Sequence, residues 1–293
     1  MTSIQDDRIF PPFPPGGELR MPFFYASTAF FWTFYTAPKD KLNKYLEGTG
    51  LETTTFADLG PDVGLVSMNF QNYTAHLGVG MSLVNEVEFN IHCHPVSQAE
   101  DVPSITFDDY MYGQEQTKLV GGFRLHVPAD NQFAVKAGIE VFGERKFLTT
   151  FQYKVPAPNM PGVKTWDYQV TDPNIGPAGP GEAFIYRVTA DLAGARPTLG
   201  NASPITLYSL LPGGPEAPPS NGRLAGSRWN LLGMYESYLD LSTAKLTLKF
   251  GGSQHPMCKD MEDIIGDSPC MAVRYFHSPP SAVENRAYWV DPK

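Results

Sequence analysis

Apolar and polar side chains alternate over several stretches of the chain and predict β-strands. In NEVEFNIHCHP, residues 85–95, the two sets are Val87, Phe89, Ile91 and Cys93 against Glu88, Asn90, His92 and His94. Successive side chains of a strand point to opposite faces, so this pattern predicts one dry face and one wet face. The wet face would carry two imidazoles and at least one carboxylate.

Similar runs, separated by proline and glycine, predict further strands. They are Val63–Asn69, Gly121–Val127, Phe133–Phe142, Phe147–Tyr153, Ala183–Leu192, Ile205–Leu211, Leu246–Phe250 and Met271–His277. Helical signals are fewer: one helix opens at Ala37-Pro38 and ends at Gly48, and another spans Pro256–Ile265. Many strands and few helices predict a mainly β (α+β) fold built on antiparallel sheet.

The 293 residues fit one large β domain, 1–293, because β barrels and sandwiches often reach this length. Residues 155–228 differ from the rest, since proline- and glycine-rich stretches bracket two strand-like runs. This segment is expected to be a hairpin excursion from the main sheet.

Composition narrows the environment and the partners. Charged residues make up 18% of the chain, against about 25% in an average protein, which favours a homo-oligomer whose subunits cover part of the surface. The net charge of −9 argues against nucleic-acid and anionic-membrane partners. The uncharged run Met21–Ala37 is short for a membrane helix, which needs about 20 apolar residues. Three cysteines and a start without a signal pattern predict a cytoplasmic protein.

The histidine pair raises the question of a metal site. His92 and His94 would project from one strand face about 7 Å apart, a spacing that metal sites use. A third ligand is needed, and His76, His126, Glu86 or Glu88 would serve only if the fold brought one of them near. We therefore expect a polar strand face and no metal, and keep a metal-dependent β-barrel enzyme as an alternative.

The segment Phe123–Leu148, FRLHVPADNQFAVKAGIEVFGERKFL, carries the most specific pattern. An Asp-Asn pair is followed by an apolar run into Gly-Ile-Glu at 138–140, four residues, and then Arg-Lys-Phe at 145–147. This segment resembles the acetoacetate decarboxylase family, in which a strand, an Asp-Asn turn and a second strand ending in G-R-E precede P-K-K by four residues. The spacing matches without gaps.

The resemblance implies a curved antiparallel sheet closed into a cone or barrel, with a few short helices and no cofactor. It places the Schiff-base lysine at Lys146 and an acid that moves protons at Glu86. Substrate contacts would come from four further positions. These are Phe147, where the family has a second lysine; Glu140, in the G-x-E motif; Thr28, near the family's substrate-binding arginine; and Asn69, near a second acidic position.

Schiff-base chemistry requires a neutral amine, whereas a lysine of pKa about 10.4 is almost fully protonated at pH 7. A cationic neighbour or an apolar pocket can lower that pKa, and acetoacetate decarboxylase is an example. Because Phe147 replaces the second lysine, we expect desolvation by apolar neighbours to lower the pKa of Lys146.

These residues predict a Schiff-base lyase of decarboxylase type whose partner is a small keto acid or related carbonyl compound. The absent arginine and second lysine argue against acetoacetate itself. An aldolase or dehydratase would use the same lysine iminium. A non-catalytic barrel that binds a hydrophobic ligand is a further alternative, given 13% aromatic residues.

Overall fold

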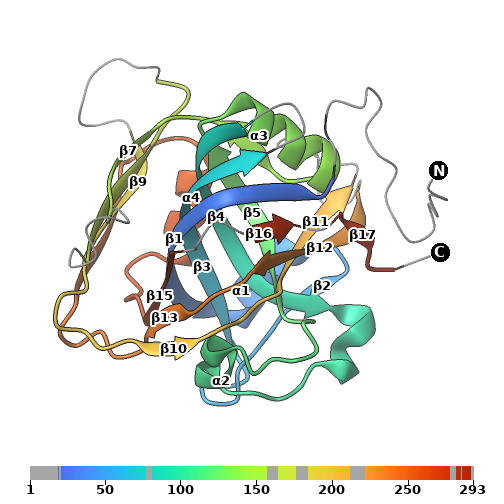
Figure 1. Ribbon diagram of the computed structural model, residues 1–293. Helices are drawn as coiled ribbons and strands as arrows, with labels where there is room; N and C mark the ends of the chain where they lie inside the picture. The colour runs from blue at the N-terminus through green and yellow to red at the C-terminus, as the bar shows by residue number, and fades with distance from the viewer. Residues whose placement is uncertain are drawn as a thin grey trace.

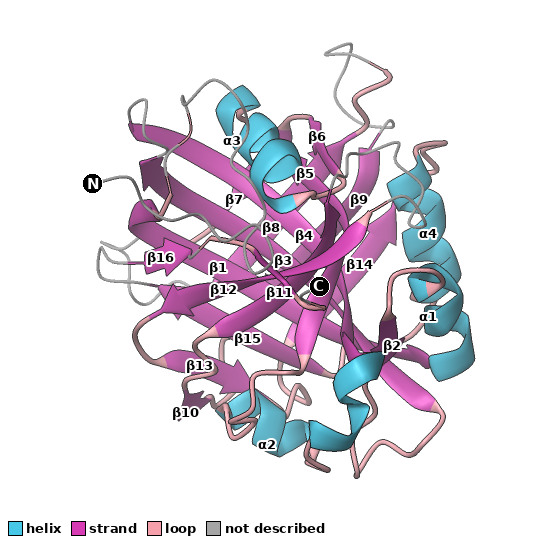
Figure 2. Ribbon diagram, turned by 90° about the vertical axis from the view of Figure 1, so that its right-hand side faces the viewer, coloured by secondary structure: helices cyan, strands magenta, loops and turns pink. Residues whose placement is uncertain are grey.

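The computed structural model describes Leu19 and residues 21–76, 81–156, 164–175, 184–211, 222–277, 282–284 and 286–291. Over these ranges the chain is mainly β with a few short helices, as predicted (Figures 1 and 2). The helical elements are α1 (Lys39–Leu46), a 3₁₀ segment (Val96–Asp101), α2 (Phe107–Tyr112), α3 (Gln132–Ala137), a π-helical turn (Gly138–Phe142) and α4 (Pro256–Ile264).

Within the described ranges, thirteen strands form one large, strongly curved sheet (Figure 1). They are β1 (Phe23–Pro38), β2 (Leu51–Thr53), β3 (Val63–His76), β4 (Met81–Pro95), β5 (Gly121–Ala129), β6 (Lys146–Leu148), β10 (Thr198–Gly200), β11 (Ile205–Leu211), β12 (Arg223–Leu231), β13 (Tyr235–Tyr238), β15 (Ala272–His277), β16 (Ala282–Glu284) and β17 (Tyr288–Trp289). Most pairings are antiparallel, but β5 pairs in parallel with β6 and β11. Successive pairings lead from β1 through β3, β4, β5, β11, β12 and β16 back to β1.

A second sheet packs against the outside of β1 and β3 (Figure 1, left). It contains four strands over the described residues: β7 (Phe151–Lys154), β8 (Thr165–Thr171), β9 (Phe184–Asp191) and β14 (Lys245–Phe250). Aromatic rings join the two sheets, with Phe31 stacked on Trp166 at 4.8 Å and Phe70 on Tyr168 at 4.5 Å between centroids. This second layer removes the outer face of the large sheet from water.

The strands β1, β3 and β4 are therefore covered on both faces. The polar side chains of β4, from Glu86 to His94, are all buried. The expected wet face is thus an enclosed polar interior, because the curved sheet folds round that face. Alternation along the strand was predicted correctly, but alternation does not distinguish solvent from a polar cavity.

The predicted strand Phe133–Phe142 is wrong: this segment is α3 followed by the π-helical turn. The Asn131 side chain caps α3 by accepting hydrogen bonds from the backbone N–H groups of Phe133 and Ala134, at 2.9 and 3.1 Å. An N-cap asparagine satisfies amides that have no partner within the helix, and it therefore starts a helix here. In the structure α3 lies at one end of the curved sheet and α2 at the other (Figures 1 and 2).

The segment 155–228 is divided between the two sheets. Its described first half supplies β8 and β9 to the smaller sheet, while β10, β11 and β12 belong to the large one. The second half departs from the expected excursion because Ile205–Leu211 is buried between β5 and β12. Proline and glycine mark where the chain turns but not which sheet it rejoins. Among the described residues, no helix combines the length and apolar character needed to cross a membrane.

Candidate functional site

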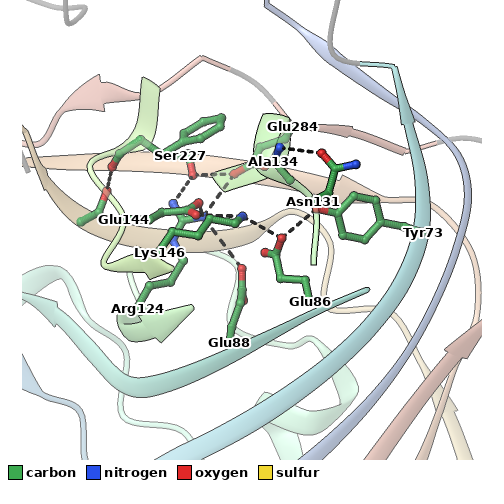
Figure 3. A network of polar contacts seen from close by, with 12 residues as sticks. Tyr73, Glu86, Glu88, Arg124, Asn131, Ala134, Glu144, Lys146, Ser227 and Glu284 are labelled. Carbon is green, nitrogen blue, oxygen red and sulfur yellow. Dashed lines mark hydrogen bonds and ion pairs between the residues drawn. The ribbon is translucent and has the colours of Figure 1, made fainter. Parts of the chain in front are cut away.

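Lys146 projects into the polar interior near α3 and meets two carboxylates (Figure 3). Its Nζ lies 2.7 Å from Oε2 of Glu86 and 3.0 Å from Oε2 of Glu144. Lys146 is only 4% exposed, and Glu86 is equally buried. The prediction that Glu86 shares a cavity with Lys146 is confirmed.

The local backbone accounts for this placement. The short strand β6 pairs in parallel with β5, so that Lys146 lies in register with Val127. Three residues before Lys146, Gly143 ends the π-helical turn as its C-cap, and its φ of 69° suits glycine. At Gly138 a Cβ atom would overlap the side chains of Glu144 and Lys146. The glycine of the G-x-E motif therefore makes room for the lysine and its partner.

Arg124 of β5 joins the same network from the other side of Glu144 (Figure 3). Its guanidinium donates to Oε1 of Glu144, and the same NH1 lies 3.6 Å from Glu284 and 3.9 Å from Glu88. Ser227 donates to Glu284 at 3.1 Å. Four carboxyl groups thus surround two cations in a region that is almost closed to water.

Two tyrosines donate hydrogen bonds to the carboxyl groups of Glu86 and Glu284. Tyr73 of β3 donates to Oε2 of Glu86 at 2.7 Å, and Tyr25 of β1 donates to Glu284 at 3.1 Å. The phenol of Tyr73 therefore contacts the same carboxylate oxygen that contacts Lys146.

The carboxyl groups differ in their preference for the ionised form. Burial raises the pKa of Glu86 and of Glu284, and the nearby cations only partly offset it. Burial also raises the pKa of Glu88, to about 7. Burial opposes ionisation of Glu144 too, but Arg124 and Lys146 together bring its pKa below the ordinary value. Glu144 is therefore the carboxylate most firmly ionised.

The expected lowering of the pKa of Lys146 is wrong. Burial alone would lower it, but Glu144 and Glu86 outweigh burial and raise the pKa of the amine above its ordinary value. Glu144, which the prediction from apolar neighbours did not include, accounts for the difference. Lys146 rests as an ammonium ion held between two carboxylates.

The cavity beside Lys146 is small, about 30 Å³. This is room for two or three waters, at about 10–15 Å³ for each. Tyr25, Tyr73, Phe142 and Trp229 line it together with the charged groups, and α3 covers it through Ala134 and Ala137. A bound molecule larger than this volume would have to shift these side chains.

Comparison with known proteins gave a result only at the level of three-dimensional structure. No family model matches the sequence, and no curated protein matches it. Among solved structures, the enduracididine biosynthesis enzyme MppR complexed with pyruvate is 13% identical with a TM-score of 0.60, and the match covers 97% of each chain. The fold is that of the acetoacetate decarboxylase-like enzymes. An acetoacetate decarboxylase from Legionella pneumophila (12% identity, TM-score 0.60, 96% and 92% covered) and an acetoacetate decarboxylase-like enzyme from Sphingomonas wittichii RW1 (12%, 0.57, 94% of each chain) are similar to the same extent. The resemblance drawn from residues 123–148 is thus confirmed for the fold.

Within this acetoacetate decarboxylase-like fold, the four predicted substrate contacts do not line the Lys146 cavity. Phe147 points the opposite way along β6 and packs on His255 with 4.5 Å between ring centroids. Glu140 is exposed on the π-helical turn. Thr28 and Asn69 are buried in separate rows of the sheet, in register with Tyr73 and Trp32 respectively.

Other residues of the site were missed. Glu144 precedes Lys146 by two positions, and in an extended chain that spacing puts both on one side, so this signal was present in the sequence. Arg124 carried a weaker signal as an arginine within a strand. Glu284 gave none, because it reaches the site from the far end of the chain through β16.

The histidines of β4 are hydrogen-bonded to protein groups. His92 contacts the hydroxyl of Tyr110 at 2.9 Å and that of Ser67 at 3.0 Å, and burial lowers its pKa to about 3. His94 contacts Thr54 and Glu52. Across the part of the chain that the structure describes, no three His, Cys, Asp or Glu side chains are grouped to hold a metal ion.

The raised pKa of Glu88 gives a prediction for stability. The folded state binds the Glu88 proton more tightly than the unfolded state, so this contribution is complete below about pH 4.5 and is lost as the pH rises through 7. Glutamine does not ionise, so Glu88→Gln should not lose stability in this way as the pH rises. Between pH 5 and 8 its free energy of unfolding should rise relative to wild type by about 2–3 kcal/mol, at about 1.4 kcal/mol per pKa unit. Urea unfolding across this range measures the difference, and parallel curves for the two proteins would contradict it.

Proposed function

We propose that this protein is a Schiff-base-forming lyase that acts on a keto acid or related carbonyl compound, with Lys146 as the nucleophile. The observation that carries the proposal is the 2.7 Å contact between Nζ of Lys146 and Oε2 of Glu86 inside an enclosed cavity. An amine and a carboxyl of raised pKa, in direct contact and shielded from water, can exchange the proton that the reaction must move.

The steps follow from this contact. Glu86 takes a proton from the ammonium of Lys146, and the neutral amine attacks the substrate carbonyl. Water then leaves the carbinolamine as Glu86 returns the proton. In sum, a carbonyl and an ammonium give an iminium and water, with one positive charge on each side.

The iminium accepts the electron pair of the bond that breaks. In a decarboxylation this is the bond to the carboxyl carbon, which leaves as carbon dioxide. The resulting enamine takes up a proton from water through Glu86, and hydrolysis releases the product and restores the Lys146 ammonium. Aldol cleavage and dehydration would use the same iminium.

The raised pKa of Lys146 is compatible with this chemistry because the ammonium and the iminium carry the same charge. Glu86 and Glu144, which stabilise the ammonium, would stabilise the iminium in the same place. The carboxylates disfavour the neutral amine that attacks, so rapid proton transfer to Glu86 becomes essential. The two carboxylates therefore stabilise the covalent iminium more than the free amine.

Two further observations support the proposal. The ring of pairings from β1 back to β1 would act as the wall of the cone that the family resemblance implies, and it surrounds Lys146. Among proteins of similar fold, MppR has been obtained in complex with pyruvate, a keto acid, and with the condensation product of pyruvate and imidazole 4-carboxaldehyde.

Borohydride trapping tests the proposal. Incubation of the wild-type protein with a reactive keto acid and borohydride should add the mass of the reduced substrate to the peptide that contains Lys146, because borohydride fixes an iminium as a stable amine. Peptide mass mapping locates the adduct. A protein that turns over a keto acid while Lys146 stays unmodified would overturn the assignment.

One observation favours a second candidate, a non-catalytic binding protein. A lysine held as an ammonium ion between two carboxylates is also what a purely structural ion pair would show. Under this reading the buried charges would orient a bound carbonyl compound without reacting. Saturable binding of a keto acid without any borohydride adduct would support it.

A further inference from the structure

The polar interior contains a second buried guanidinium, Arg274 of β15, which is 2% exposed. Its NH2 donates to the backbone carbonyls of Met111 at 2.8 Å and Tyr110 at 3.4 Å, and its Nε has no hydrogen-bond partner. No carboxylate of the described residues forms an ion pair with it, in contrast to Arg124, which has three acidic neighbours. Arg274 is therefore the interior arginine left available to an anion.

Arg274 lines a cavity of its own near α2, again about 30 Å³. Its guanidinium lies 5.5 Å from the ring centroid of Trp32 and 5.6 Å from that of Phe34, and burial lowers its pKa. Rings and two carbonyls compensate only part of a buried charge, and an uncompensated buried charge is costly.

The other ionisable groups of this cavity do not neutralise the guanidinium. Lys118 adds a second cation, whose amine donates to the carbonyl of Ala202. Glu115 accepts hydrogen bonds from Thr117 and from the backbone N–H of Lys118. Because burial lowers its pKa to about 3, His92 is neutral near pH 7. The cavity thus carries one positive charge in excess.

The Lys146 cavity has the opposite character. Four carboxyl groups face two cations there, so a substrate carboxylate beside Lys146 would meet acidic oxygens and no free cation. A keto acid whose reacting carbonyl is at Lys146 needs a separate place for its carboxylate. Arg274 offers that place.

Buried amides connect the two cavities. Asn90 lines the Arg274 cavity and donates at 3.1 Å to Glu88, which lines the Lys146 cavity. Buried amide atoms of Asn69, Gln71 and Asn90 lack hydrogen-bond partners. Such groups are costly inside a protein unless water or a ligand meets them. The interior between Arg274 and Lys146 therefore contains buried polar atoms that lack hydrogen-bond partners.

We propose that Arg274 binds the carboxylate of the substrate, and that the substrate is an oxo acid whose carboxylate is separated by several carbon atoms from the carbonyl that reacts with Lys146. One row of the sheet runs from Arg274 through Trp32 and Asn69 to Glu88, which lines the Lys146 cavity. Three strand spacings of about 4.8 Å separate the ends of that row, roughly 14 Å along the sheet. The inference specifies the substrate class of the proposed lyase and rests on that proposal. A carboxylate held at Arg274 is too far from the iminium to leave as carbon dioxide, so the bond that breaks would be one at the carbon next to the iminium carbon, as in aldol cleavage or dehydration.

A pair of ketones of equal length tests it. Borohydride adducts at Lys146 are measured against concentration for 7-oxooctanoate and for the uncharged 2-octanone. Wild type should prefer the acid, and Arg274→Gln should reduce that preference about ten- to hundredfold, the value of a hydrogen bond to a charged group. Arg274→Lys, which keeps the charge, should restore part of the preference. An unchanged preference in Arg274→Gln would overturn the inference and leave Arg274 as a cap on the carbonyls of α2.

Octanoate, which cannot form a Schiff base, separates this inference from the proposed function. Calorimetry should show octanoate binding to wild type and binding at least tenfold weaker to Arg274→Gln. Octanoate binding that depends on Arg274, without any adduct at Lys146, supports the anion site and contradicts the lyase. Adducts at Lys146 without octanoate binding contradict the anion site and support the lyase. Urea unfolding of Arg274→Gln checks that the variant is folded under the binding conditions.

Discussion

Lys146→Ala and Lys146→Arg lose the borohydride adduct and all turnover of a keto-acid substrate. Alanine has no nucleophile, and the guanidinium of arginine stays charged at neutral pH and offers no free amine. Mass mapping after trapping, together with a turnover assay, measures both losses. Lys146→Ala also leaves buried Glu86 without its cation, while Glu144 keeps Arg124, and breaking a buried pair in this way costs about 3–5 kcal/mol. Because the pKa of Glu86 is already raised, protonation of Glu86 will recover part of that cost.

A matched double variant separates lost chemistry from lost stability. Lys146→Met with Glu86→Gln removes one cation and one carboxylate, and Glu144 keeps Arg124 as its partner. This variant should unfold at a higher urea concentration than Lys146→Ala and remain inactive. Turnover by either the double variant or Lys146→Arg would rule out Lys146 as the nucleophile.

Glu86→Gln slows adduct formation at Lys146 by about 10²–10⁴-fold, the usual contribution of a positioned proton acceptor. Glutamine can occupy the same space and still accept from Tyr73, but it cannot take the proton from the ammonium. The adduct should still form, because Glu144 continues to stabilise a cation at this position. Borohydride trapping of samples taken at short, defined times measures the rate of adduct formation.

Glu88→Gln is the control for this variant. Glu88 lines the same cavity, but it forms no ion pair with Lys146 among the described contacts. At pH 8 or above, where Glu88 with its pKa of about 7 is mostly ionised, the change removes a carboxylate charge from the cavity without removing the acceptor. Equal slowing by the two variants would mean that cavity charge, and not proton transfer at Glu86, sets the rate.

The sequence predicted the parts of the fold that depend on local pattern. The alternation in β4 and the apolar run Ile205–Leu211 gave strands at the observed positions. The segment after Asn131 was mistaken for a strand because its apolar residues were read without the N-cap that starts α3. The division of 155–228 between two sheets depends on pairings between distant strands, which local pattern does not contain.

The same limit applies to the site. Lys146 could be placed from the ungapped spacing to a known family, Glu86 only from the family resemblance at the head of the 85–95 strand, and Glu144 from its position two residues before Lys146. Long-range pairing of β5 and β16 brings Arg124 and Glu284 to the Lys146 cavity, and pairing of β15 brings Arg274 to its own cavity near α2. The direction of the pKa shift of Lys146 depends on two carboxylates within 3.0 Å, so it followed from the folded geometry and not from neighbouring residue types.

Because of the π-helical turn Gly138–Phe142, the number of residues before Lys146 determines where its side chain points. An α-helix rotates about 100° per residue, and a π-turn accommodates one residue more than the α-helical turn it replaces. Deleting a residue between Gly138 and Gly143 would convert the turn to an ordinary helical one and rotate the connection to β6 relative to α3. Glu144 and Lys146 would then leave the cavity together. The number of residues between the G-x-E motif and the lysine is therefore constrained by the rotation of the helix.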